Sequence, residues 1–263
     1  MVFCIRKNKL ICNIFAEDNA FTVMMRLSDQ QYQAAVVGQM LLTERKNVMD
    51  DMQLFIIFCM ELTGTVAFAA SGAMVGIRRG MDIFGVCVLG VVTAVGGGMT
   101  RDVILGTVPG ALLDPVYVMV AVCTALSVFF ILYYKKTFLQ GKIGIFYEKT
   151  MFVMDTAGLG IFTVIGVITG IRSGYLENTF LLTFLGTLTG VGGGLLRDMM
   201  AGVPPYIFVK HVYACASVAG AISCVWIYRA FGQIPAMIIA SALVILIRTL
   251  AAHYRWNLPH IRL

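Results

Sequence analysis

The sequence predicts an all-α polytopic membrane protein, with seven transmembrane helices arranged as an inverted 3+3 repeat plus a seventh helix. Three observations lead to this fold class. The 263 residues are 59% hydrophobic and 13% charged, whereas soluble domains carry about 25% charged residues. Seven stretches reach the length of about 20 apolar residues that a spanning helix needs. A glycine-rich segment also occurs twice, at 89–109 and at 185–205.

The predicted spans follow one another with short connections, which indicates one compact helical body. In order they are 54–76, 84–107, 116–134, 152–171, 180–202, 209–228 and 234–252. The expected division of the chain is an N-terminal extension (1–51), a first repeat (52–140), a second repeat (141–230), and a seventh helix with its tail (231–263).

The repeat is visible in two places. LGVVTAVGGGMTRDVILGTVP (89–109) and LGTLTGVGGGLLRDMMAGVPP (185–205) are identical at eleven of 21 positions. The first and fourth spans share a second pattern, in which Glu61, Gly64, Phe68 and Gly72 have the same spacing as Asp155, Gly158, Phe162 and Gly166. Because each repeat holds three spans, an odd number, the second repeat must enter the membrane from the opposite side.

The glycine triplets lie in the middle of the second and fifth spans, at Gly96, Gly97, Gly98 and at Gly192, Gly193, Gly194. Glycine costs backbone entropy in a helix and supplies no side chain, so we expect both helices to be broken there. Such breaks in matching positions of two halves indicate a transport path, and their freed carbonyls are suitable ligands for monovalent cations. The alternative is close helix packing through small residues. The doubling favours the ion path.

Each triplet is followed by an arginine and an aspartate, Arg101–Asp102 and Arg197–Asp198. Charges inside a membrane are expensive and face a partner or a cavity. Adjacent helical residues point about 100° apart, so we expect each arginine to pair with something other than its own aspartate. The expected partners are freed carbonyls at the helix break or a carboxylate on another helix. Structural locking of the helix is favoured over direct ion contact, because an arginine in a narrow path would repel cations.

Glu61 and Asp155 are the remaining acidic residues within the spans and occupy equivalent positions near the starts of spans one and four. Two interpretations of these carboxylates are equally favoured. One carboxylate at each pore mouth would concentrate cations. Alternatively, each carboxylate interacts with a helix N-terminus or with an arginine. Arg248, in the seventh span, is expected to snorkel to the membrane interface.

Other function classes find no support in the sequence. The seven cysteines and three histidines show no metal-ligand spacing, and no nucleophile–base pair emerges. We therefore expect no metal, no cofactor and no enzymatic activity. The net charge of +6 comes from residues in short loops, which predicts membrane orientation and not nucleic-acid binding.

Positive residues in short loops set the orientation. Nine lie on one side of the predicted membrane and two on the other, if the N-terminal segment is left out: Arg78, Arg79, Lys135, Lys136, Lys142, Lys149, Lys210, Arg255 and Arg262 against Arg172 and Arg229. This bias predicts a plasma (inner) membrane protein with a cytoplasmic C-terminus and an external start of the first span.

Residues 1–48 do not fit this orientation, because six of them are positive and none forms a spanning run. They are either a poorly ordered extension or lie upstream of a true start at Met49 or Met52. We favour the second interpretation and expect a chain beginning at Met49 to insert, assemble and conduct like the longer one. Failure of that shorter chain to insert would contradict it.

The segments FAASGAMVGIRRGMDIFGVCVLGVVTAVGGGMTRD (68–102) and GVGGGLLRDMMAGVPP (190–205) closely resemble the prokaryotic branch of the trimeric intracellular cation channel family. The same sequences are also labelled as an uncharacterised membrane family with a glycine transporter domain. The resemblance covers about residues 52–252.

The resemblance implies a homotrimer with one pore inside each protomer and potassium as the main permeant ion. It implies that the glycine triplets kink the second and fifth helices around the pore. The lysine-containing pore motif of the animal members is absent, so voltage sensing is not carried over. The alternative that the second label implies is a secondary transporter of a small amino acid such as glycine.

Overall fold

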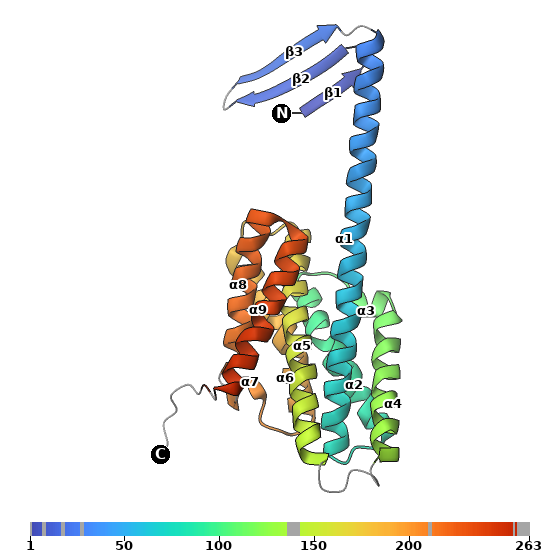
Figure 1. Cartoon of the computed structure of the whole chain (residues 1–263), viewed down its shortest axis with the longest axis vertical. Coiled ribbons are helices and arrows are strands. Elements are labelled where there is room, and N and C mark those ends of the chain that lie inside the picture. Colours follow the sequence, from blue (N-terminus) through green and yellow to red (C-terminus); the bar gives the residue numbers. More distant parts are fainter. Residues whose placement is uncertain are drawn as a thin grey trace. The chain divides into compact units, whose positions relative to one another are not determined.

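The computed structural model describes residues 2–6, 9–16, 19–26, 29–135, 143–209, 212–254 and 256, and the side chains in 51–134, 148–207, 212–254 and at 256. The chain divides into two compact units, Met1–Phe55 and Ile56–Leu263. Within the described ranges, the helical second unit contains the features relevant to function (Figure 1).

The N-terminal unit contains a three-stranded antiparallel sheet with strand order β1-β2-β3. The strands are β1 (Val2–Arg6), β2 (Lys9–Ala16) and β3 (Asn19–Arg26). They are rich in Val, Ile and Phe, which favour extended backbone. These strands were not predicted, because the segment was interpreted either as a poorly ordered extension or as sequence upstream of the true start. Helix α1 (Asp29–Arg78) follows the sheet.

Seven helices of the described chain are long and apolar enough to cross a membrane, which confirms the predicted number and identifies a multi-pass membrane protein. The first is the part of α1 at Asp51–Arg78. The others belong to α2 (Ile83–Ile104), α4 (Val116–Lys135), α5 (Ile143–Arg172), α6 (Thr179–Met200), α8 (Tyr213–Phe231) and α9 (Gln233–His253). Two short helices, α3 (Gly110–Leu113) and α7 (Tyr206–Val209), follow α2 and α6.

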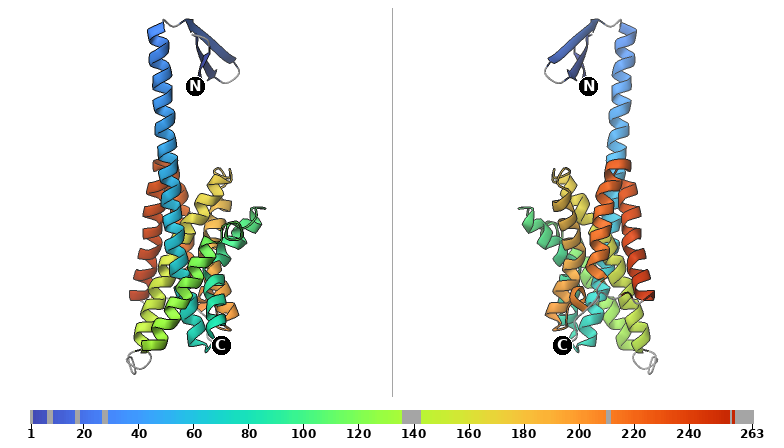
Figure 2. Two further views of the ribbon diagram at one scale, coloured as in Figure 1. Left: turned by 90° about the vertical axis from the view of Figure 1, so that its right-hand side faces the viewer. Right: turned by 90° about the vertical axis from the view of Figure 1, so that its left-hand side faces the viewer.

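The two repeats share their local chemistry. Asp82 and Asn178 cap α2 and α6, and each side chain accepts a hydrogen bond from the backbone three residues on. Gly106 and Gly202 follow the ends of α2 and α6 with φ of +72° and +62°, a conformation that glycine adopts without strain. Figures 1 and 2 show α3 and α7 towards opposite ends of the helical body.

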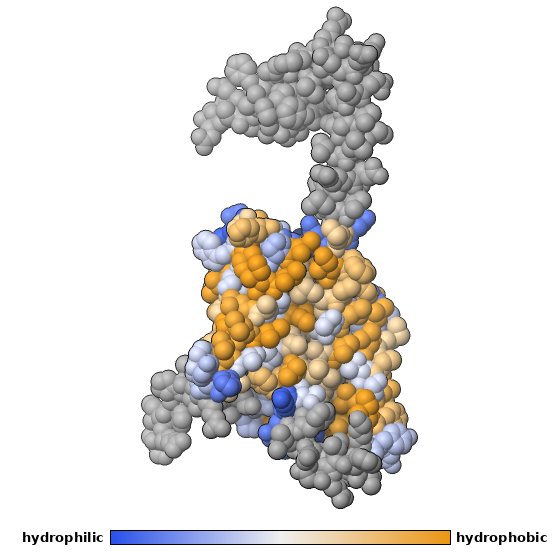
Figure 3. Space-filling model, in the orientation of Figure 1, coloured by the Kyte–Doolittle hydropathy of each residue, from blue (hydrophilic) through white to orange (hydrophobic). Residues whose placement is uncertain are grey.

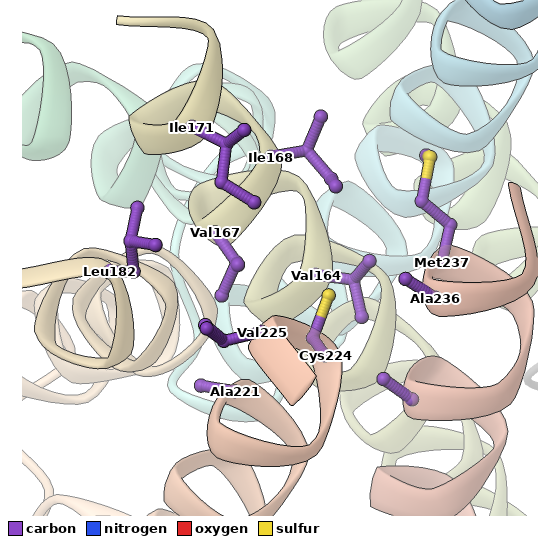
Figure 4. Packing of buried hydrophobic residues seen from close by; sticks show 11 residues of the cluster. Val164, Val167, Ile168, Ile171, Leu182, Ala221, Cys224, Val225, Ala236 and Met237 are labelled. Carbon is purple, nitrogen blue, oxygen red and sulfur yellow. The ribbon is translucent and has the colours of Figure 1, made fainter. Parts of the chain in front are cut away.

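The core of this unit lies around α5, which packs against α6, α8 and α9. Figure 4 shows the largest buried cluster, in which Val164 and Val167 of α5 meet Cys224 of α8 and Met237 of α9. Large apolar side chains at other positions remain on the surface, for example Phe84 and Phe180, which are 74% and 82% exposed. Figure 3 shows hydrophobic residues over much of the visible face, which is the surface that a lipid-embedded protein presents.

The prediction that the second and fifth spans are broken is wrong, because α2 and α6 are continuous helices through both triplets. The glycines instead let the two helices touch. A side chain added at Gly97 would collide with the backbone carbonyl of Thr189, and one at Gly193 would collide with that of Thr93. Two effects keep the helices intact despite the backbone entropy that glycine costs. A broken helix in lipid would leave polar backbone groups without hydrogen-bond partners, and the glycines allow the two backbones to pack closely.

Candidate functional site: two equivalent polar sites

Each arginine of the repeated motif binds its own aspartate. Arg101 Nε donates to Asp102 Oδ1 at 2.8 Å, and Arg197 Nε donates to Asp198 Oδ1 at the same distance. The expectation that neither arginine pairs with its own aspartate is therefore wrong, whereas the expected pair with a carboxylate on another helix is formed by Arg197 with Asp155. The arginine side chain is long and flexible enough to bend sideways along the helix and reach the adjacent carboxylate.

The second oxygen of each aspartate holds the next short helix. Asp102 Oδ2 accepts from the backbone N–H of Gly110 at 3.0 Å, and Asp198 Oδ2 accepts from that of Tyr206 at 2.9 Å. Each aspartate thus links the end of a spanning helix to the start of α3 or α7. This geometry supports the structural interpretation of the motif, since it fixes the turn after each triplet-bearing helix.

One polar site is closed and belongs to the second repeat. The second-repeat site consists of Asp155 on α5, Arg197 and Asp198 on α6, and Tyr213 on α8. Asp155 is completely buried and accepts from Arg197 Nη1 at 2.7 Å. Arg197 Nη1 also donates to the hydroxyl of Ser71, and the Tyr213 hydroxyl lies 3.5 Å from Asp155 Oδ1.

A residue from the seventh span completes this closed site. Arg248 of α9 is 5% exposed, and its Nη2 lies 3.2 Å from Asp155 Oδ2. The expectation that Arg248 snorkels to the interface is wrong, because a buried carboxylate within reach binds it instead. Asp155 does not present a free carboxylate at a pore mouth, since two arginines surround it. The second interpretation of Asp155, a pair with arginine, describes this arrangement.

The corresponding site of the first repeat is open. The first-repeat site consists of Glu61 on α1, Arg101 and Asp102 on α2, and Tyr117 on α4. These residues line a cavity of ≈ 370 Å³ that is also bounded by α3 and α5. The Tyr117 hydroxyl donates a hydrogen bond to Glu61 Oε2. Among the described residues, no arginine forms a salt bridge with Glu61.

The cavity has a negative balance of formal charge. Its described lining includes three carboxylates, those of Glu61, Asp102 and Asp114, and one guanidinium, that of Arg101. Low-dielectric walls strengthen the field of such a group of charges. The open site therefore has a net negative formal charge, whereas the four charges of Asp155, Arg197, Asp198 and Arg248 cancel in the closed site.

The six glycines of the triplets do not share one environment. Gly97, Gly192 and Gly193 lie at the contact between α2 and α6. Gly96 also faces α6, where an added side chain would meet that of Leu196, and Gly194 lies against the Tyr213 hydroxyl. Gly98 lines the cavity of the first-repeat site, and a side chain added there would find its nearest neighbour, Arg101 Nη2, at 3.8 Å.

Sequence reasoning missed three residues of the two sites. Tyr117 and Tyr213 lie 96 residues apart, the same offset as the repeated glycine motif, so a longer alignment of the repeats would have found them. Arg248 has no counterpart in the first repeat, and its role became visible only when the fold brought α9 beside Asp155.

A family described as Glycine transporter matches this chain over residues 58–133 and 152–229, which are the two repeats just described. The chain belongs to the glycine transporter family. Each matched segment contains one glycine triplet and the two acidic residues, the arginine and the tyrosine of one polar site.

Relatives and solved structures agree with this family. The UPF0126 inner membrane protein YadS of Escherichia coli is 32% identical over 78% of this chain and 95% of its own length. A structure described under conductance through TRIC cation channels is 30% identical, with a TM-score of 0.67 over 78% of this chain and 97% of its own. A TRIC trimeric intracellular cation channel orthologue from Rhodobacter sphaeroides is 28% identical, with a TM-score of 0.66 over 76% and 99%. The resemblance to the TRIC channels that the glycine motifs suggested is thereby confirmed.

Proposed function

We propose that this protein is a potassium-permeable cation channel of the plasma membrane, with a pore inside each protomer of a homotrimer. The cavity of the first-repeat site carries the proposal. It combines excess carboxylates with a glycine, Gly98, that leaves the space beside α2 open. A cation entering this cavity would meet Glu61, whose described hydrogen-bond partner is a neutral tyrosine.

The pore assignment differs in one respect from the sequence-based expectation. Both triplet-bearing helices were expected to line the path, but the described cavity is bounded by α1, α2, α3, α4 and α5 and not by α6. We therefore assign ion contact to the Gly98 region and helix packing to Gly97 and Gly193. In the proposed orientation, with a cytoplasmic C-terminus, this cavity faces the external side, because it lies at the starts of the first and third spans.

A second candidate function is transport of a small amino acid such as glycine. The family's description favours it, and the cavity offers both a guanidinium and carboxylates, which suit the two charges of a zwitterion. A carrier would need to release its ligand on the other side, where the second-repeat site is closed in this structure.

Planar-bilayer recording of the purified protein in a potassium gradient, with and without glycine, separates the two functions. Discrete conductance steps that do not need glycine are the result expected for a channel. Electrically silent flux that requires glycine would contradict the channel and establish the carrier.

Glu61→Gln tests the cavity directly. We expect about tenfold lower potassium conductance at low ionic strength and a smaller difference at high salt, because salt screens the attraction between carboxylate and ion. Glu177→Gln is the matched control, since Glu177 is an exposed carboxylate in the connection at the same end of the helical body, between α5 and α6. Equal conductance of the two variants would remove Glu61 from the ion path.

A further inference from the structure

The two polar sites share their residue types but differ in their ion pairs. Arg197 binds Asp155, whereas no described arginine forms a salt bridge with Glu61. In both, an acidic residue faces a tyrosine hydroxyl and an arginine–aspartate pair. The first-repeat site opens onto a cavity, whereas the second-repeat site contains the side chain of Arg248. Since α9 lies outside the repeat, Arg248 is an addition to a site that is otherwise made of the same kinds of residue as the open one.

The surroundings of Arg248 are those of a bound cation. Its guanidinium carbon lies 4.3 Å from the ring centre of Tyr213 and 5.3 Å from that of Phe152. One of its nitrogens reaches Asp155 Oδ2. Aromatic faces and a carboxylate are the groups that proteins use to hold cationic ligands.

Arg248 is held less firmly than the other arginine of the site. Arg197 donates to Asp198, Asp155 and Ser71 through two nitrogens. Arg248 has one hydrogen bond, to Asp155. Each arginine also has one buried nitrogen without a partner among the described residues, Arg197 Nη2 and Arg248 Nε, so the difference lies in the number of bonds that each forms. Arg197 is therefore the structural partner of Asp155, and Arg248 is the one that another cation can replace.

We propose that the second-repeat site is a latent site for a monovalent cation, which the guanidinium of Arg248 occupies and closes in this structure. Withdrawal of the Arg248 side chain would leave Asp155 and Asp198 with one arginine, Arg197, so that the site would have a net negative formal charge, as the first-repeat site has. In this proposal α9 holds the Arg248 side chain in the site and so blocks it at the cytoplasmic end. The expected effect of Arg248 on ion flow rests on the proposed channel function, whereas the binding of a cation at the second-repeat site does not.

Binding is tested in detergent, without flux. Arg248→Ala is expected to unfold at a lower temperature than wild type in choline chloride. Replacing choline by about 300 mM KCl, or adding methylguanidinium, should raise the midpoint of thermal unfolding of Arg248→Ala by about 3–6 °C. A ligand that binds the folded state stabilises that state. Wild type and Arg248→Lys, which keep a tethered cation, should not respond. Arg229→Ala, which removes an exposed arginine of α8, controls for general effects of losing a positive charge.

Potassium flux into proteoliposomes is the second measurement, and Arg248→Ala is expected to exceed wild type severalfold. Two outcomes overturn the latent site. In one, potassium raises the unfolding temperature of Arg248→Ala no more than that of wild type. In the other, neither potassium nor methylguanidinium restores folding of Arg248→Ala, although Arg248→Lys folds. If neither wild type nor Arg248→Ala shows potassium flux, but the unfolding temperature of the variant depends on potassium, the channel function is contradicted. The latent cation site is then still supported.

Discussion

Arg197→Ala is expected to destabilise the folded protein by about 3–5 kcal/mol, because the substitution leaves a buried carboxylate without its main partner. Arg197 is fully buried, and it bridges Asp155 of α5 and Asp198 of its own helix. Loss of the arginine therefore affects two helices at once. Thermal unfolding in detergent, together with the yield of folded protein, measures the effect.

Arg101→Ala is the matched variant from the other repeat and should cost less, about 1–3 kcal/mol. Arg101 binds Asp102, but its side chain borders the open cavity, where water can replace the lost hydrogen bonds. The double variant Asp155→Asn with Arg197→Ala should recover part of the stability, since it removes the unpaired charge. Equal losses for the Arg101 and Arg197 variants would contradict the difference between an open and a closed site.

Gly97→Ala and Gly193→Ala are each expected to destabilise the protein by about 1–3 kcal/mol, which is typical of overpacking. The added methyl group would meet a backbone carbonyl of the facing helix, at Thr189 or at Thr93. A carbonyl within a helix cannot turn away as a flexible side chain can, so α2 and α6 must move apart.

Gly98→Ala is the matched control one residue along the same helix. Its added methyl group has its nearest neighbour at 3.8 Å, and alanine favours the helix over glycine by about 1 kcal/mol. We therefore expect Gly98→Ala to be as stable as wild type or more stable. If Gly97→Ala melts at the same temperature as Gly98→Ala, the glycine triplets do not hold α2 and α6 in contact.

Much of the architecture could be predicted because lipid leaves few choices. A chain with seven apolar stretches in a membrane must form helices, since its backbone groups find no other partners there. The repeated GGG and RD motifs then identified corresponding positions in two halves, and the equivalent hydrogen bonds of Asp102 and Asp198 agree with that correspondence.

The candidate site could be predicted only in part. Glu61, Gly98, Arg101 and Asp102 were all selected from the sequence, and all four line the cavity. The same patterns assigned Asp155 an equal role at the other mouth, but α9 brings Arg248 to it. Periodicity along one helix carries no information about which distant helix packs against it.

The amino-acid sequence by itself determined the number of spans, the repeat and the residue types at its two polar sites, because hydrophobic length and repeated motifs are local properties. Only the tertiary structure decided how the glycines and charges are used. Contact between α2 and α6 made Gly97 and Gly193 packing residues within intact helices. The approach of α9 closed one of two equivalent sites, while the other kept its cavity. The physical reason is that a buried charge takes whichever partner the packing of distant helices brings within reach.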